Sequence, residues 1–241
     1  MKNLCDYSNE QAKKILLETQ KIICVISAAE PVQNLALNIN EFITQKIADK
    51  VCEKTKYYQT TPILQGIITP FKPLASTGLH KNRFSSLISD CVCSLSFAGA
   101  KKIFFLTSSD LFSSSIIKGI KNYKSKLPSD FSVKIICWQN LKIVEKTVEN
   151  QFENLCEYWR KESAIFLLAN ELKGIEIPNA PPKLRFSKED FLKWKKRGMD
   201  PEKLRKLSPN YQFSFWTKYE PLNYSFLDKI CDEICDELSK L

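Results

Sequence analysis

The polar run at residues 107–110, Thr-Ser-Ser-Asp, is the strongest candidate for a binding or catalytic site in this chain. It directly follows an apolar segment at residues 102–106 that is typical of a buried strand. Ligands of open α/β sheets bind at the carboxyl ends of the strands. The hydroxyl groups of this run would hydrogen-bond a polar ligand, and the carboxylate of Asp110 could act as a general base.

The sequence contains few residues that could support other kinds of catalysis. The only histidine, His80, lies in a polar turn where we expect a surface position, so neither a Ser–His nor a Cys–His pair is well supported. The nine cysteines contain no Cys-x-x-Cys pair, and the six glycines form no Gly-x-Gly. Zinc sites usually draw on several imidazoles, so we expect no metal site and no other cofactor. Glu162 precedes an apolar segment and is either a buried carboxylate or a surface helix cap.

Composition indicates an ordinary globular protein. The chain has 241 residues, of which 44% are hydrophobic and 26% charged, and its formal net charge is +9. These values exclude disordered, collagen-like and disulfide-scaffold classes. No apolar run approaches the length of about 18 residues that a membrane span needs. The first residues are charged rather than apolar, so we expect a cytoplasmic protein without a secretory signal.

Hydrophobic patterning alternates between helical and strand-like segments up to about residue 170, which is typical of an α/β layered domain. Ser8 is placed to cap the first helix, and Asn40 to cap the second. The pattern does not decide whether residues 164–172 form a helix or a strand. The expected strands lie at residues 21–27, 61–68, 102–106 and 132–138. Helices are expected at residues 40–51, 83–97 and 144–159. Two further helices are expected, one after Ser8 that carries Ala12 and residues 15–17, and one that contains Ile116, Ile117 and Ile120.

The final third of the chain differs from the rest in its hydrophobic pattern and charge. Residues 178–210 are predicted to form a basic helical insertion, and residues 225–240 an amphipathic helix that packs on the core. The segment 183–206 combines lysines and arginines with aromatic residues. We expect it to be a solvated surface. The alternatives are a binding surface for an acidic protein partner and a nucleic-acid site. The central basic patch of this segment consists of Lys193, Lys195, Lys196 and Arg197.

Two runs of the sequence resemble conserved motifs of the creatininase (creatinine amidohydrolase) family. Residues 25–37, VISAAEPVQNLAL, are similar to the family's run from Val-Gly-Ser to His-Leu-Pro-Leu. Residues 107–112, TSSDLF, take the place of the family's Asn-Gly-His-Gly-Gly-Asn, and Trp138 resembles its strand-end tryptophan. The likeness covers nearly the whole chain. It implies one domain over residues 1–241: a three-layer α/β/α sandwich with a mostly parallel central sheet. It also implies assembly into homo-oligomers.

The resemblance further implies amide or formamide hydrolysis at a two-metal site, but the metal ligands of the family do not match this chain. They fall on Ala29, Pro31, Asn40 and Ser109, of which the first two have no side-chain donor and the others are poor metal ligands. Only Glu162 matches a family carboxylate in this alignment, and a single carboxylate does not hold a metal pair. A shift of one residue would place Glu30 at the family's glutamate but would not restore the histidines.

We therefore expect a non-catalytic protein with this scaffold that binds a small polar ligand or serves in assembly. The first alternative is an amide hydrolase with an unconventional, metal-poor site that uses Glu162 or Asp110 as general base. The second alternative is nucleic-acid binding through residues 183–206. The expected pocket is lined by Asn34, Asn40, Thr107, Ser108, Ser109 and Asp110.

Overall fold

The computed structural model describes residues 2–27, 38–64, 66–67, 78–151, 157–175 and 222–240. Their central element is a four-stranded sheet with the strand order β2-β1-β5-β6, in which all strands run parallel. β1 (Lys21–Ile26), β5 (Lys102–Thr107) and β6 (Ser132–Cys137) pair in register along their whole length, and β2 (Tyr58–Gln59) borders β1. β3 (Gly66–Ile67) and β4 (Gly78–Leu79) form a separate two-stranded parallel sheet.

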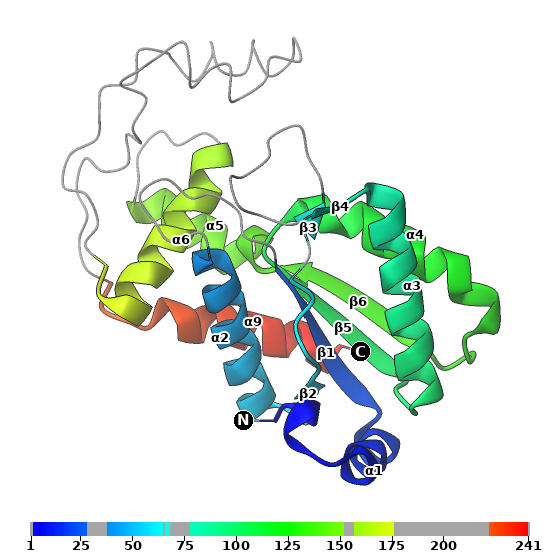
Figure 1. Ribbon diagram of the computed structural model, residues 1–241. Helices are drawn as coiled ribbons and strands as arrows, with labels where there is room; N and C mark the ends of the chain where they lie inside the picture. Colours follow the sequence, from blue (N-terminus) through cyan, green and yellow to red (C-terminus); the bar gives the residue numbers. More distant parts are fainter. Residues whose placement is uncertain are drawn as a thin grey trace.

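Helices cover both faces of the sheet, so the molecule has the expected α/β/α layers (Figure 1). On one face, Ile22, Cys24 and Ile26 of β1 pack in a cluster with the helices α1 (Asn9–Thr19), α3 (Lys81–Phe97) and α4 (Ser113–Tyr123). On the other face, Ile23 and Val25 pack with α2 (Ile39–Lys54), α5 (Lys142–Gln151), α6 (Glu157–Lys173) and α9 (Phe226–Ser239). A strand buried on both faces needs apolar side chains at successive positions, which explains the continuous apolar run in β1.

The helix ends follow from local chemistry in two clear cases. The Ser8 hydroxyl accepts a hydrogen bond from the Gln11 amide at 3.3 Å, and the Gln11 side chain accepts one from the Ser8 amide at 3.0 Å, so α1 begins with a capping box. Gly99 follows α3 with a φ of +108°, a backbone conformation that favours glycine. No described helix has the length and apolar character required to traverse a bilayer.

Two expectations about elements are wrong. The predicted strand at residues 61–68 is not one strand of the central sheet: Ile63 forms only an isolated bridge to Ile26, and β3 at Gly66–Ile67 belongs to the separate two-stranded sheet. The strand that borders β1 is instead β2 at Tyr58–Gln59. Pro62 lies next to that bridge and has no amide hydrogen to extend the ladder. The single predicted helix at 144–159 is two helices, α5 and α6, and α6 also includes residues 164–172. Residues 163–169 are all buried, so this part of α6 shows no amphipathic period.

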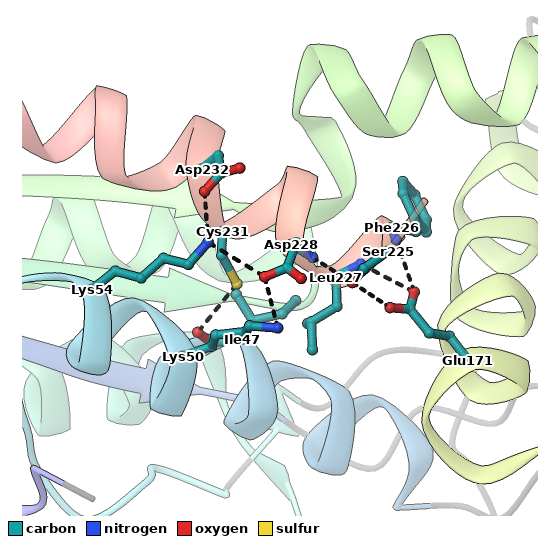
Figure 2. Close-up of polar contacts among 10 residues, drawn as sticks. All are labelled: Ile47, Lys50, Lys54, Glu171, Ser225, Phe226, Leu227, Asp228, Cys231 and Asp232. Atoms are coloured by element: carbon teal, nitrogen blue, oxygen red, sulfur yellow. Dashed lines mark hydrogen bonds and ion pairs between the residues drawn. The ribbon is translucent and has the colours of Figure 1, made fainter. Parts of the chain in front are cut away.

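The C-terminal helix α9 is fastened to α2 and α6 by charged side chains (Figure 2). Lys50 and Lys54 of α2 pair with Asp228 at 2.7 and 3.3 Å, and Lys54 also pairs with Asp232 at 2.6 Å. Beneath these ion pairs the Cys231 thiol lies 3.8 Å from the backbone carbonyl of Ile47. The helix expected at residues 225–240 is therefore present and packs on the core, whereas the predicted insertion at 178–210 lies outside the described residues.

Candidate functional site

Two buried serines meet where β1 and β5 end. Ser27 follows β1 and Ser108 follows β5, and neither side chain is exposed. The Ser27 hydroxyl donates a hydrogen bond to the Ser108 hydroxyl at 3.2 Å. Because side chains alternate along a strand, Ser108 faces the same side of the sheet as Phe104 and Leu106, which belong to the cluster that α2 covers. The serine pair therefore lies at the α2 side of the sheet's carboxyl edge.

A second pair of contacts fixes the start of α2 over the same edge. Trp138 directly follows β6, and its indole Nε1 donates to the Thr44 hydroxyl oxygen at 3.0 Å. The Thr44 hydroxyl in turn donates to the backbone carbonyl of Asn40 at 2.7 Å. All three residues are fully buried. The first two turns of α2 are thus held in place by the tryptophan that ends the neighbouring strand.

Asn40 does not cap α2, because the helix begins at Ile39 and Asn38 occupies the cap position. Its side chain is instead fully buried in the first turn. Neither its Oδ1 nor its Nδ2 has a hydrogen-bond partner in the described part of the chain. Buried polar side chains are nearly always paired, so this amide is an exception that needs an explanation.

The predicted run at residues 107–110 divides between different environments. Thr107 is buried, and because successive side chains point to opposite faces of a sheet, it lies on the other face from Ser108. Its hydroxyl has no hydrogen-bond partner among the described residues. Ser109 is half-buried and Asp110 is exposed. The Asn140 side-chain amide donates to the carboxylate of Asp110. Ser108 and Asn40 therefore belong to two buried pairs at the α2 side of the sheet, Ser27–Ser108 and Asn40–Thr44, which we together call the buried polar cluster, and Asp110 is exposed.

The other candidates can be placed only in part. Glu162 belongs to α6, but its side chain is not described. Asn34 and the basic patch Lys193, Lys195, Lys196 and Arg197 lie outside the described residues. His80 precedes α3 and is exposed, as expected from its polar turn.

Sequence reasoning missed Ser27 and Thr44 as members of the cluster. Ser27 follows a buried strand just as Ser108 does, and that shared position was an available signal. Thr44 lies four residues after Asn40, the spacing that places two side chains on one helix face. Trp138 was recognised only through the family resemblance.

The buried cysteines do not supply a nucleophile. Burial raises the pKa of the Cys24, Cys52 and Cys231 thiols to about 12, which keeps them protonated at neutral pH. They behave as small apolar side chains in the two core clusters.

Known proteins share this architecture. No sequence family matches the chain, and no curated protein matches it by sequence. Among solved structures, a creatinine amidohydrolase (creatininase) is 12% identical, with a TM-score of 0.71 over 99% of this chain and 97% of its own. A manganese form of creatininase is 13% identical with a TM-score of 0.74, and a creatininase variant complexed with creatine is 14% identical with a TM-score of 0.74; each covers 99% of this chain and 98% of its own.

The chain has the creatininase fold. This confirms the predicted α/β/α sandwich with a parallel central sheet.

The described residues at this edge do not by themselves form the metal pair that the resemblance to the creatininase family implies, and Ala29, Pro31 and the Glu162 side chain lie outside the described part of the site. The described cluster offers only the hydroxyl groups of Ser27, Ser108 and Thr44 and the amide of Asn40, which are uncharged and weak ligands for zinc or manganese. Nowhere in the described ranges do three His, Cys, Asp or Glu side chains gather in a way that could hold a metal ion. The described side chains at this edge can hydrogen-bond a polar molecule.

Proposed function

We propose that this protein is a non-catalytic relative of creatininase that binds a small polar ligand at the carboxyl edge of its sheet. The observation that carries the proposal is the buried, uncharged polar cluster of Ser27, Ser108, Thr44 and Asn40 at that edge. In open α/β sheets this is the position where ligands bind. Hydroxyl and amide groups bind and orient a polar ligand, and none of the four described side chains is a general base that could activate water.

The hydrogen bonds within the polar cluster hold its side chains in fixed positions, which favours binding of a ligand. The Trp138–Thr44 contact and the Ser27–Ser108 contact fix the cluster before a ligand arrives. Groups that are already fixed lose little conformational entropy on binding, so a small ligand retains more of its interaction energy.

The proposal is tested by metal content, turnover and binding on the same preparation. The full chain, purified without a metal-affinity tag, is incubated with zinc and manganese, desalted and examined by elemental analysis. Creatinine and creatine, the molecules named with the similar structures, are then offered in a hydrolysis assay and in calorimetric titration.

We expect less than about 0.1 metal ion per chain, since tight metal binding requires a complete set of ligands. We also expect no turnover, and binding that weakens when Ser108 is replaced by alanine. Turnover with one or two metal ions per chain, both lost in Glu162→Ala, would instead establish an unconventional amide hydrolase. Failure of both compounds to bind in the absence of turnover would leave an assembly role as the better explanation.

A further inference from the structure

Strand β6 forms one edge of the central sheet, because it is last in the order β2-β1-β5-β6. The Ser132 amide donates to the Lys101 carbonyl at 2.8 Å, so the backbone of Ser132 faces β5. Neighbouring residues of a strand direct their backbone groups to opposite sides, so those of Val133 and Ile135 point away from β5. No described residue hydrogen-bonds to them. Such an open row of donors and acceptors is a template for a further strand.

The one charged side chain of β6 does not protect this edge. Edge strands are often kept from pairing by charged side chains, lysine above all. Lys134 is the only charged residue of β6, and its Nζ lies 2.7 Å from a carboxylate oxygen of Glu237 in α9. It also donates to the Glu237 backbone carbonyl at 2.8 Å. Its charge is therefore compensated within the chain, and an added strand would not bury an unpaired ammonium group.

Helix α4 packs against α3 along one flank. A Cβ atom added to Gly119 would lie 2.6 Å from the Ser85 carbonyl oxygen and 2.9 Å from the Ile88 side chain, both in α3. Gly119 therefore marks the flank of α4 that faces α3. A helix turns by about 100° per residue, so the positions two residues before and after Gly119 are about 200° away from it. They lie on the flank that faces away from α3.

That outer flank carries an apolar and basic stripe, which consists of Ile117, Lys121 and Lys124. Their spacing of four and three residues places them on one helix face. Ile117 is 45% exposed. Both lysines are exposed, and neither forms an ion pair with a described residue. Residues 113–126 contain no aspartate or glutamate, so the stripe is positively charged.

The basic stripe lies beside the open edge of β6. At its end α3 approaches α1, which leads into β1, since a Cβ atom on Gly99 would lie 2.9 Å from Leu17. On its other flank α3 packs on α4, which leads into β6. The helices therefore follow the order of the strands, and α4 is next to the edge strand. Two isoleucines of α4 pack in one cluster with Val133 and Ile135.

We propose that the open edge of β6 and the basic stripe together bind an extended acidic segment of a partner protein, which adds to the sheet as an antiparallel strand. Antiparallel pairing is slightly more stable per residue than parallel pairing. Alternate side chains of the segment face α4, where an apolar residue meets Ile117 and two acidic residues meet Lys121 and Lys124. Three alternate positions span about 13 Å of strand, and the stripe spans about 10 Å of helix.

A second copy of this chain fits the edge less well. Two β6 strands in antiparallel pairing would be related by a two-fold axis perpendicular to the sheet, so both α4 helices would lie on the same face. The two basic stripes would then approach each other, and like charges across an interface are unfavourable. An acidic partner strand avoids this repulsion. The surface shares no residue with the buried polar cluster, so its test is independent of the proposed ligand binding.

Two synthetic peptides test the charge of the partner. One is Thr-Ile-Thr-Glu-Thr-Glu-Thr with both ends blocked, and the other has lysine in place of both glutamates. Each is titrated into the isotope-labelled full chain at low ionic strength and followed by NMR. We expect the acidic peptide to shift the amide signals of Val133 and Ile135 and to bind at least about tenfold more tightly than the lysine peptide. Equal binding of the two peptides, or no binding of the acidic one, overturns the proposal.

Charge reversal on α4 locates the site. In the double variant Lys121→Glu/Lys124→Glu we expect the lysine peptide to bind more tightly than the acidic peptide. Lys13→Glu/Lys14→Glu is the matched control, because it changes the net charge equally at two exposed lysines of α1, and it should leave the original preference in place. If both double variants change the preference alike, the peptide responds to net charge rather than to the stripe, and the proposal is wrong.

N-methylation of the acidic peptide tests strand pairing without altering the protein. In antiparallel pairing, residues opposite Val133 and Ile135 have their side chains on the same face, so their amides are those of the glutamates. Methyl groups on these two amide nitrogens should weaken binding at least about tenfold. Methyl groups on two threonine nitrogens, which face away from β6, should not. Equal binding of the two methylated peptides overturns the added strand, as does a peptide-free dimer in which the Val133 and Ile135 amide hydrogens already exchange slowly.

Discussion

Replacing Glu171 with alanine tests how the C-terminal helix is held. The Glu171 carboxylate extends from α6 and accepts hydrogen bonds from the backbone amides of Phe226 and Leu227, at 3.0 and 3.1 Å. It also accepts one from the Ser225 hydroxyl at 2.6 Å. The first amides of a helix have no partner within the helix, so this carboxylate satisfies groups that α9 cannot satisfy itself (Figure 2).

The expected loss of stability can be calculated from the three hydrogen bonds that Glu171 accepts. A typical hydrogen bond contributes about 0.5–1.5 kcal/mol net, so three would contribute about 2–4 kcal/mol. Glu171 is exposed, and water can replace part of what is lost. We therefore expect Glu171→Ala to lower the free energy of unfolding by about 2 kcal/mol. The Ser225 hydroxyl still accepts from the Asp228 amide at 3.1 Å, so one cap remains in the variant.

Urea unfolding followed by circular dichroism measures this effect. If the free energy of unfolding falls by about 2 kcal/mol for each molar increase in urea, the urea concentration at the unfolding midpoint should be about 1 M lower in Glu171→Ala. Glu53→Ala is the control, because Glu53 is an exposed glutamate on α2, and it should change stability by less than about 0.5 kcal/mol. If the two variants unfold at the same midpoint, the carboxylate contributes nothing to docking of α9 and the reasoning is wrong.

Three further predictions concern other contacts. Trp138→Phe removes the donor to Thr44 at 3.0 Å and should lower the free energy of unfolding by about 2 kcal/mol in the same assay. Gly119→Ala would place a methyl group 2.6 Å from a backbone carbonyl of α3, so we expect a loss of about 1–3 kcal/mol and a lower melting temperature. Lys134 above all holds the pKa of Glu237 at about 2, below its ordinary value of 4.5, so the stability from this pair is present above about pH 4.5 and is lost as the pH falls towards 2. Unfolding measured across that range should depend less on pH in Lys134→Met.

The three long strands β1, β5 and β6 and most helices could be predicted because their signals are local. The continuous apolar run of β1 and the capping residue Ser8 each determine a nearby piece of backbone. The part of α6 at residues 163–169 could not be assigned because it is buried on all sides and its sequence has no period. Short strands such as β2 depend on pairing with a distant strand, which local pattern does not contain.

For the candidate site, the sequence predicted where Ser108 lies in the fold but not which side chains contact one another. The position of Ser108 after a buried strand predicts that it lies at the carboxyl edge of the sheet, where the structure places it. The environment of Asn40 could not be foreseen, because asparagine is also a favoured helix cap and only the packed structure shows that Asn38 takes that position. The Trp138–Thr44 bond joins residues separated by 94 positions, and no local signal predicts such a pair.

The docking of α9 on α2 also has a consequence for synthesis of the chain. The Cys231 thiol and the Ile47 carbonyl that it contacts are separated by 184 positions. At a translation rate of about 5–20 residues per second, α9 emerges about 10–40 s after α2. During that interval the apolar side chains with which α2 later packs against α9 have no covering helix. A nascent chain stalled before residue 226 should therefore be bound by chaperones that recognise apolar segments, and release should follow once α9 has emerged.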